Sequence, residues 1–200
     1  NNPQINTNGD GEIQTSEASS FTGTINAPNL NIEDLTGIEA FTRVTRLYVN
    51  NNLLSLINLS ANTALVALRC NHNQLTSLDV SHNTLLTDLR CYVNNLSSLD
   101  ISALTNLEIL HAFQNSFTSI GTYTNHRLRE VNLAFNKLTT LDLRDNPMLT
   151  YLDVKQNNLK YFLLDNGNNV NITYFNAVRN VDLLCIQVDD PAYSKANWKN

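Results

Sequence analysis

The sequence contains no apolar run close to the roughly 20 residues that a membrane-spanning helix requires, so we expect no membrane insertion. Basic residues are also scarce, because 13 lysines and arginines stand against 18 aspartates and glutamates. Without a basic stripe for phosphate contacts, nucleic acid is a poor partner. The opening Asn1-Asn2-Pro3 has no signal-peptide pattern and reads as a mature or trimmed boundary, which leaves the compartment open.

Cysteine is the next residue in short supply. Three cysteines are too few for a disulfide scaffold, and an odd number leaves at least one of them unpaired. Charged residues make up only 16% of the 200 residues, while hydrophobic residues reach 42%. A chain of this size and composition suits a single domain with a buried core, in which asparagine, serine and threonine supply much of the polar surface.

What the sequence does have is a repeat. Six consecutive segments of 21 residues, from 44–64 to 149–169, share the template L-x-x-L-x-(V/C/L)-x-x-N-x-L-x-x-L-x-(V/L/I). Positions 4 and 6 are apolar between polar neighbours, so positions 3 to 7 predict a short strand with one buried side. Successive strands would stack about 4.8 Å apart in a parallel sheet. Asparagine fills position 9 every time, as Asn52, Asn73, Asn94, Asn115, Asn136 and Asn157.

The asparagine column has a physical reason. Where the chain turns away from the sheet, its backbone N–H and C=O groups lose their ladder partners, and a buried amide side chain can satisfy them. The units at either end are less regular: segment 22–43 has Leu30 in place of the asparagine, and another unit begins at Ile172 with Asn180 in register. Atypical terminal units are expected of a repeat array.

A coil of 21 residues is too short to hold both a strand and a long helix. The second apolar pair of each unit, such as Leu78 and Val80, predicts a short extended segment on the convex side, and asparagine at position 19 marks the return turn. We therefore predict a mainly β leucine-rich-repeat solenoid of about eight coils, with a parallel concave sheet and little helix. Residues 1–21 would form an N-terminal cap, 22–184 the repeats and 185–200 a closing segment.

Segments such as Leu75-Thr76-Ser77-Leu78-Asp79-Val80-Ser81-His82-Asn83-Thr84 resemble the secreted leucine-rich-repeat proteins of Bacteroidetes and, more loosely, the internalins. The resemblance spans nearly the whole chain, because 34–41 looks like an entry unit of these proteins and 185–190 like their closing segment. It implies secretion or display at the cell surface. It names no ligand, since the binding partners of this family are diverse.

An EF-hand-like pattern of twelve residues precedes the repeats, over residues 6–17. Oxygen-bearing side chains occupy its positions 1, 3, 5 and 12, and a glycine at position 6 permits the sharp turn that gathers ligands around a hard cation. Only two carboxylates would ligate, so we expect a weakly bound calcium; the alternative is an asparagine-rich cap that folds without metal. The predicted ligands are the side chains of Asn6, Asn8, Asp10 and Glu17 and the backbone carbonyl of Glu12.

The cysteines and histidines give weaker signals. Cys70 and Cys91 share position 6 of adjacent units, where small buried core residues are favoured over a disulfide because parallel neighbours have poor geometry for the bond. Cys185 is expected to be free. Cys70 and His72 lack a second pair of metal ligands at useful spacing, the four histidines lie at unrelated repeat positions, and no serine has a nucleophile-elbow context. We therefore predict a protein that is not an enzyme.

The outward positions 3, 5, 7 and 8 of the sheet carry the main functional signal. Aromatic side chains such as Tyr92 and Phe113 are not explained by core packing, because positions 4 and 6 already fill the core. Exposed aromatics flanked by arginine are typical of interface hot spots, and aromatic rings also stack on sugars. Scattered surface aromatics without a function are the alternative. The predicted ligand-binding residues are Tyr48, Arg69, Arg90, Tyr92, His111, Phe113, Phe135 and Tyr151.

Repeat phase adds detail to this surface. Tyr92 and Phe113 share position 7, which places their rings about 5 Å apart, and Phe135 at position 8 of the next unit would extend the apolar strip. Arg69 and Arg90 share position 5, where like charges are unfavourable unless something anionic or carbonyl-rich meets them. A binding partner could do this, and so could the neighbouring carboxylates of residues 88 and 130.

Two functions fit this pattern. The first is an extracellular or cell-surface recognition module that binds a protein or a glycan on its concave face. The second is a structural or adhesin spacer segment of a longer surface protein, whose repeats mainly provide reach. Survival of the aromatic patch in related chains would favour the first function, and drift like ordinary surface would favour the second. A hydrolase would need a convergent acid–base cluster, which the sequence does not reveal.

Overall fold

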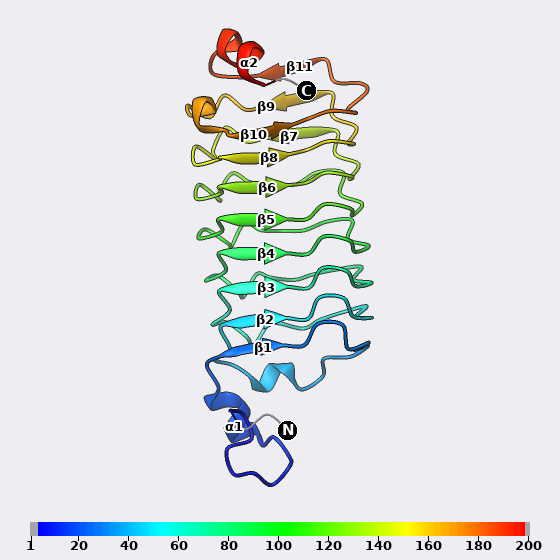
Figure 1. The fold of residues 1–200 in the computed structure, drawn as a ribbon, viewed down its shortest axis with the longest axis vertical. Coiled ribbons are helices and arrows are strands. Elements are labelled where there is room, and N and C mark those ends of the chain that lie inside the picture. The colour runs from blue at the N-terminus through cyan, green and yellow to red at the C-terminus, as the bar shows by residue number, and fades with distance from the viewer. Residues whose placement is uncertain (1–3, 199–200) are drawn as a thin grey trace.

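The computed structural model describes residues 4–198, which form one stack of coils with a strand in each coil (Figure 1). Eight strands lie side by side in a parallel sheet of order β1-β2-β3-β4-β5-β6-β8-β10. The leucine-rich-repeat solenoid predicted from the repeat is thereby confirmed. The strands of this sheet are β1 (Thr24–Asn26), β2 (Arg46–Tyr48), β3 (Ala67–Arg69), β4 (Asp88–Arg90), β5 (Ile109–His111), β6 (Glu130–Asn132), β8 (Tyr151–Asp153) and β10 (Tyr174–Asn176).

Equal positions of the repeat lie next to each other in this sheet. The register pairs Leu47 with Leu68 and Leu68 with Leu89, and position 4 stays in line through the later coils. These side chains are completely buried. Each strand covers only positions 3 to 5, which is shorter than predicted. Backbone hydrogen bonds to the next coil nevertheless continue past the strand, as from Cys70 N–H to Arg90 C=O (2.9 Å).

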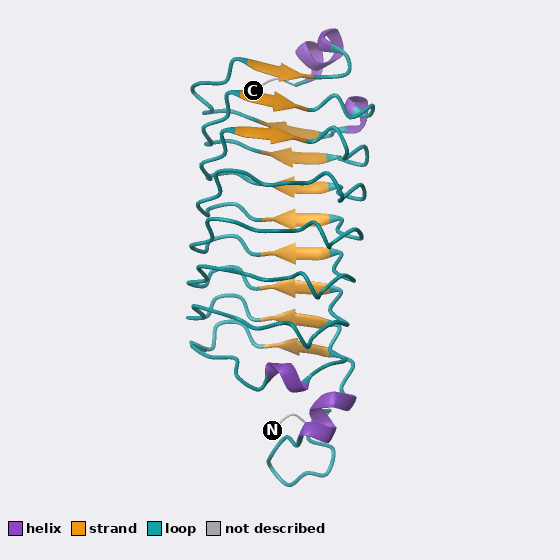
Figure 2. Cartoon of the chain, turned by 180° about the vertical axis from the view of Figure 1, so that it is seen from behind, coloured by secondary structure: helices purple, strands orange, loops and turns teal. Residues whose placement is uncertain are grey.

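The second apolar segment of the coil becomes a strand only towards the C-terminal end. β7 (Thr140–Asp142), β9 (Tyr161–Leu163) and β11 (Cys185–Gln187) form a parallel sheet of their own in the order β11-β9-β7. Seen from behind, these strands lie in front of the main sheet (Figure 2). The last coils are therefore closed by sheet on two sides, whereas the corresponding segments before residue 140 are extended loop.

The asparagines of position 9 tie neighbouring coils together, as the repeat predicted. The Asn94 amide oxygen accepts the N–H of Leu75 (3.0 Å), and its Nδ2 donates to the carbonyl oxygens of Cys70 (3.1 Å) and Cys91 (3.0 Å). The side chain is only 9% exposed, so water cannot readily replace these partners. The same three kinds of contact recur at Asn115, Asn136, Asn157 and Asn180.

The asparagines of position 19 form a second buried column, which the sequence had indicated only as a turn signal. The Asn83 Nδ2 donates to the carbonyl oxygens of Leu59 (3.1 Å) and Asn62 (3.0 Å) in the preceding coil. Leu104 interrupts the column and is equally buried. These amides therefore stabilise the stacking of the return turns from inside the core. The four of them, each fully buried, are Asn62, Asn83, Asn125 and Asn146.

Position 8 of the coil adopts the left-handed backbone conformation, so it is not an outward strand position as we expected. The chain leaves the sheet here, and a positive φ turns it towards the next segment. A β-branched residue strains this conformation most, which singles out Val93 with φ 53°. The other residues of the series are Asn51, His72, Gln114, Phe135, Gln156 and Arg179, with φ from 52° to 60°.

Helix is found mainly at the two ends of the stack. α1 (Thr15–Ser20) precedes the first coil and α2 (Pro191–Asn197) follows β11, while η1 (Ile38–Ala40) and η2 (Asn169–Asn171) are single 3-10 turns. Trp198 stacks on Phe175 with 4.4 Å between ring centroids and covers the last coil. Within residues 4–198 no helix is both long and apolar enough to cross a membrane.

Candidate functional site

With the exception of Phe135, the predicted ligand-binding residues lie on the outer surface of the eight-stranded sheet, which we call the strand face. Position 4 is buried, so positions 3 and 5 of each strand project outward, and position 7 follows the strand on the same side. Neighbouring strands lie about 4.8 Å apart, so side chains of equal position form columns along the solenoid. The position-3 column runs from Thr24 to Tyr174, and the position-5 column runs from Asn26 to Asn176.

Two aromatic residues of position 7 stack as their phase predicted. The ring centroids of Tyr92 and Phe113 are 4.2 Å apart and the rings are inclined by only 10°. The His72 ring meets Tyr92 edge-on, with 5.3 Å between centroids. Tyr92 and Phe113 remain half-buried, while the next residue of the column, Ala134, is small and buried. The stack therefore ends at the fifth strand.

Phe135 does not extend this stack as we expected. It occupies position 8, where the left-handed backbone (φ 56°) directs the chain away from the strand. Its ring instead lies 5.4 Å from the ammonium group of Lys155 in the next coil, and the residue is 40% exposed. The phase of the repeat placed Phe135 in the correct coil, but the conformation of position 8 separates it from Phe113.

A second aromatic pair lies near the C-terminal end of the strand face. Tyr151 and Tyr174 share position 3 and stack with 4.5 Å between centroids and 6° between planes. Asp153 lies on the same strand as Tyr151 with its side chain 4% exposed, and it pairs with Lys155 Nζ at 3.4 Å. Burial, helped by Asp153 and Tyr174, raises the pKa of Tyr151 to about 12. Asp153 was not predicted from the sequence, although its outward position on the same strand as the predicted Tyr151 was a signal for it.

Arg69 and Arg90 share one carboxylate. Asp88 Oδ1 accepts from Arg90 Nε at 2.8 Å, while Arg69 Nη2 lies 3.6 Å from Asp88 Oδ2. The guanidinium of Arg69 lies over the ring of Tyr48, 4.5 Å from its centroid. Asp88 is therefore the anionic group that meets the two arginines, which was one of the alternatives left open by the sequence. Glu130, the other acid considered there, has a different partner.

Glu130 pairs with His111 on the neighbouring strand. His111 Nε2 lies 3.4 Å from Glu130 Oε2. Burial, and then the positive charge of Arg90, lower the pKa of His111 more than Glu130 and Asp88 raise it. The imidazole is therefore neutral at pH 7, and the arginines hold the positive charge of this part of the strand face.

The N-terminal loop predicted to bind calcium is compact. Asn6, Asn8 and Asp10 each accept the backbone N–H of a residue two or three places ahead through Oδ1, at 2.8, 3.0 and 3.0 Å respectively. Gly11, at the sixth place of the pattern, has φ 93°, a value that other residues rarely adopt. The loop thus turns as the twelve-residue pattern requires.

Glu17 closes this loop in the structure. Its carboxylate accepts the N–H groups of Thr7 (2.7 Å), Asn8 (3.1 Å) and Gln14 (3.2 Å). Burial raises the pKa of Glu17, but these hydrogen bonds outweigh it and the net shift is downward. Glu12 is exposed. Among the described residues no group of three or more histidine, cysteine, aspartate or glutamate side chains is placed to hold a metal ion.

The three cysteines are free thiols. Cys70 and Cys91 are completely buried in adjacent coils, and burial raises the pKa of Cys70 to about 12. Burial, and then the nearby Cys70, raise the pKa of Cys91 as well. Both side chains therefore act as small core residues, as sequence analysis favoured, while Cys185 is exposed on β11.

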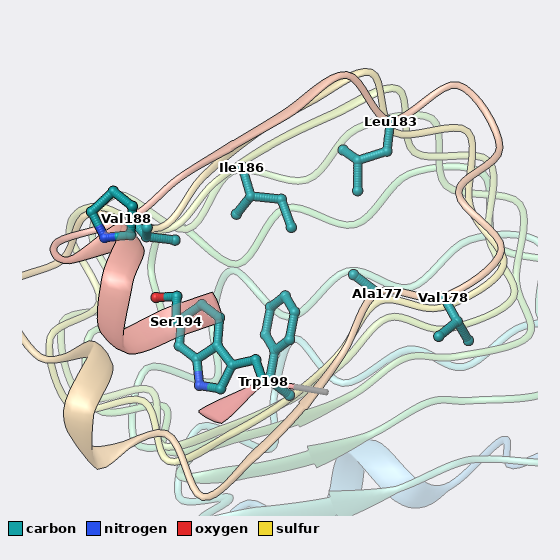
Figure 3. Close-up of a pocket in the computed structure, with 9 residues that line it drawn as sticks. Ala177, Val178, Leu183, Ile186, Val188, Ser194 and Trp198 are labelled. Carbon is teal, nitrogen blue, oxygen red and sulfur yellow. The ribbon is translucent and has the colours of Figure 1, made fainter. Parts of the chain in front are cut away.

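One pocket was not foreseen from the sequence. It has a volume of about 370 Å³ and lies between α2 and the last coil (Figure 3). None of the predicted ligand-binding residues lines it. Leu183, Ile186 and Trp198 are among the apolar side chains that line it. It comes from the contact between the closing helix and the core, and no repeat position signals it.

Comparisons with known proteins agree with this architecture. A family model described as the leucine-rich-repeat domain of the endo-beta-N-acetylglucosaminidase EndoS matches residues 11–146. A comparison with curated proteins found no match.

Solved structures share the fold. The functional domain of InlJ from Listeria monocytogenes, which includes a cysteine ladder, is 25% identical with a TM-score of 0.51, over 88% of this chain and 55% of that one. A leucine-rich-repeat protein of Leptospira interrogans is 24% identical with a TM-score of 0.67, over 73% and 40%. The internalin InlF of Listeria monocytogenes is 20% identical with a TM-score of 0.65, over 88% and 50%.

The chain therefore spans about half the length of these structures, with coverage from 40% to 55%. The predicted likeness to internalins is confirmed at the level of the fold. The family match is broader evidence, because it extends over more than half of the chain, from the N-terminal loop to the fifth 21-residue coil, 128–148. On this match, the chain belongs to the leucine-rich-repeat family typified by the EndoS leucine-rich-repeat domain.

Proposed function

We propose that this chain is a recognition module that binds a partner macromolecule on the strand face. The observation that carries the proposal is the pair of aromatic stacks, Tyr92–Phe113 and Tyr151–Tyr174, on the outside of a core that position 4 already fills. Half-exposed aromatic side chains beside arginines are typical of binding hot spots. The underlying parallel sheet holds them in place, so little side-chain entropy is lost on binding.

The module acts by binding and not by catalysis, and it works outside the cell or at the cell surface. The resemblance to secreted leucine-rich-repeat proteins supports the location. The enzyme name attached to the family describes the whole EndoS protein, of which the repeats are one domain. A repeat array presents a long surface built from equivalent coils, which suits recognition of an extended partner.

Replacing Phe113 with alanine is expected to weaken binding by more than about 1 kcal/mol, because hot-spot aromatics lose that much on truncation. Partners would first be found by screening extracellular proteins and a glycan array with the purified chain. Thr76→Ala is the matched control, since Thr76 is exposed outside the strand face. Both variants should melt like the parent. If the parent, Phe113→Ala and Tyr151→Ala all bind the partner equally well, the result would favour the spacer function over the recognition module.

We also propose that the loop 6–17 binds calcium weakly. The side-chain oxygens of Asn6, Asn8 and Asp10 are already oriented by their backbone contacts, and Glu17 joins the two ends of the loop. A cation at the centre would be met by the carboxylates of Asp10 and Glu17. With so little negative charge, the affinity belongs at the weak end of such sites.

Calcium is expected to raise the melting temperature of the chain and EDTA to abolish the rise. At a concentration about 100 times its Kd, a ligand of the native state stabilises by about 2.7 kcal/mol. Glu17→Gln should remove the difference between the two conditions. Glu12→Gln should keep it, because position 7 ligates through its backbone. Identical melting curves with and without millimolar calcium would show that this loop does not bind the metal.

A further inference from the structure

The strand face carries an excess of positive charge over β2, β3 and β4. Arg46, Arg69 and Arg90 project from positions 3 and 5 of these strands, and Asp88 is their only carboxylate. Asp88 contacts Arg69 and Arg90, and Arg46 has no ion-pair partner among residues 4–198. Two of the three guanidinium groups thus share one acid, on a surface where aligned like charges repel each other.

Arg69 has a buried donor without a hydrogen-bond partner. This donor is its Nε, and its terminal nitrogen is 3.6 Å from Asp88, too far for a good hydrogen bond. The ring of Tyr48 covers one side of the guanidinium plane and limits its freedom to move to another acceptor. A donor edge held in this way suits an acceptor that approaches in the plane of the guanidinium, as a carboxylate does.

Arg90 offers donors on the adjacent strand. The register places Arg90 directly beside Arg69, about 4.8 Å away along the sheet. Arg90 reaches both oxygens of Asp88 through Nε, at 2.8 and 3.2 Å, and its terminal nitrogens have no acceptor in the described part of the chain. Two guanidinium groups side by side with unused donors form a subsite for one further carboxylate.

The neighbouring aromatic stack indicates what carries that carboxylate. Tyr92 follows Arg90 by two residues, and its ring is approached by His72 on one side and stacked on Phe113 on the other. A sugar ring needs a free aromatic face for stacking, and neighbouring rings occupy both faces of Tyr92. Ring edges and the half-buried surface of Phe113 remain, and an apolar peptide side chain can pack there.

Resting on the proposed function, we propose that the partner is a protein, and that an aspartate or glutamate of an extended segment binds between Arg69 and Arg90. An apolar residue next to this acid would pack against the Tyr92–Phe113 stack. The carboxylate would supply the acceptors that the terminal nitrogens of Arg69 and Arg90 lack in the described part of the chain. Charge complementarity would fix the position of the segment, and the aromatic contact would exclude water from it.

The test is a titration of the chain with a short blocked peptide that alternates glutamate with phenylalanine and glycine. Its counterpart with glutamine in place of glutamate is the control ligand. Fluorescence anisotropy would give the affinities, and the Nε–Hε signals of Arg69 and Arg90 in NMR spectra would report the site. We expect the glutamate peptide to bind at least tenfold more tightly, with affinity falling as salt rises.

Variants locate the effect. Arg69→Gln and Arg90→Gln should each lower the affinity for the glutamate peptide at least tenfold, and Arg69→Lys should recover only part of it because an ammonium lacks the planar fork. Arg144→Gln is the matched control: Arg144 is paired with Asp142 on β7, outside the strand face, and its loss should change the affinity less than twofold. Unchanged melting temperatures would show that folding is intact.

Three results would overturn the inference: no binding of the glutamate peptide at millimolar concentration, equal binding of the glutamine peptide, or equal binding by the Arg69 and Arg90 variants. Preferential binding of a uronic-acid oligosaccharide over the peptide would also overturn it, since the carboxylate would then come from a glycan. If an identified partner depends on Phe113 but not on Arg69 or Arg90, the proposed function stands and the carboxylate subsite fails.

Discussion

Phe117→Ala is expected to lower the free energy of unfolding by about 3–5 kcal/mol, the usual cost of truncating a buried phenylalanine. Phe117 occupies position 11 of its coil and is completely buried. The other regular coils have leucine at this position, whereas position 16 of the same coil holds Thr122 in place of an aliphatic residue. The coil with the largest residue at position 11 is thus the one with the small, buried Thr122 at position 16, and we expect the neighbouring coils to hold open the cavity that truncation leaves.

Phe117→Leu is the matched control, because it restores the residue of the neighbouring coils. It should cost well under half as much as alanine, since most of the apolar contact survives. Urea or thermal unfolding, followed by circular dichroism, measures the stability of both variants. In a chain of this size, each kcal/mol of lost stability lowers the melting temperature by roughly 2–4 °C. A melting temperature for Phe117→Ala equal to that of the leucine variant would contradict the packing described for this coil.

Asn94→Ala is expected to destabilise the solenoid by about 1–3 kcal/mol. It leaves the N–H of Leu75 and the carbonyl oxygens of Cys70 and Cys91 without their side-chain partner inside a region that water hardly reaches. The cost of stranded polar groups exceeds the modest net gain of making a hydrogen bond, so the loss is larger than that of a surface contact.

The neighbouring Asn95 provides a control one residue away. Its side chain is exposed, and Asn95→Ala should change stability by less than about 0.5 kcal/mol. Asn180→Ala removes the same three contacts in the last coil and should cost less than Asn94→Ala, because a terminal coil can separate without breaking the rest of the array. Equal stability of Asn94→Ala and Asn95→Ala would argue against the asparagine column as a source of stability.

The candidate site was only partly visible in the sequence. Equal phase was enough to bring Tyr92 and Phe113 together, because equivalent positions of adjacent coils are separated by one strand spacing. Phase could not show that Asp88 contacts both Arg69 and Arg90, since that contact crosses from column 3 to column 5 and depends on side-chain rotamers. Asp153 lies on the strand face but was overlooked, because its contact with Lys155 likewise depends on side-chain rotamers that the phase does not specify.

The period of 21 residues determined by itself that the chain is a solenoid, which side chains are buried in its strands and where its asparagine column lies. Each coil repeats the same local hydrophobic pattern, so these features follow from a single coil and its neighbour. Only the tertiary structure decided that position 8 is left-handed and that the position-19 asparagines are buried. The pocket under α2 was likewise decided there. The packing of the end helix depends on a segment outside the repeat. The conformation of position 8 and the burial of position 19 recur from coil to coil, but they depend on backbone geometry and on contacts between coils, which the period of residue types does not specify.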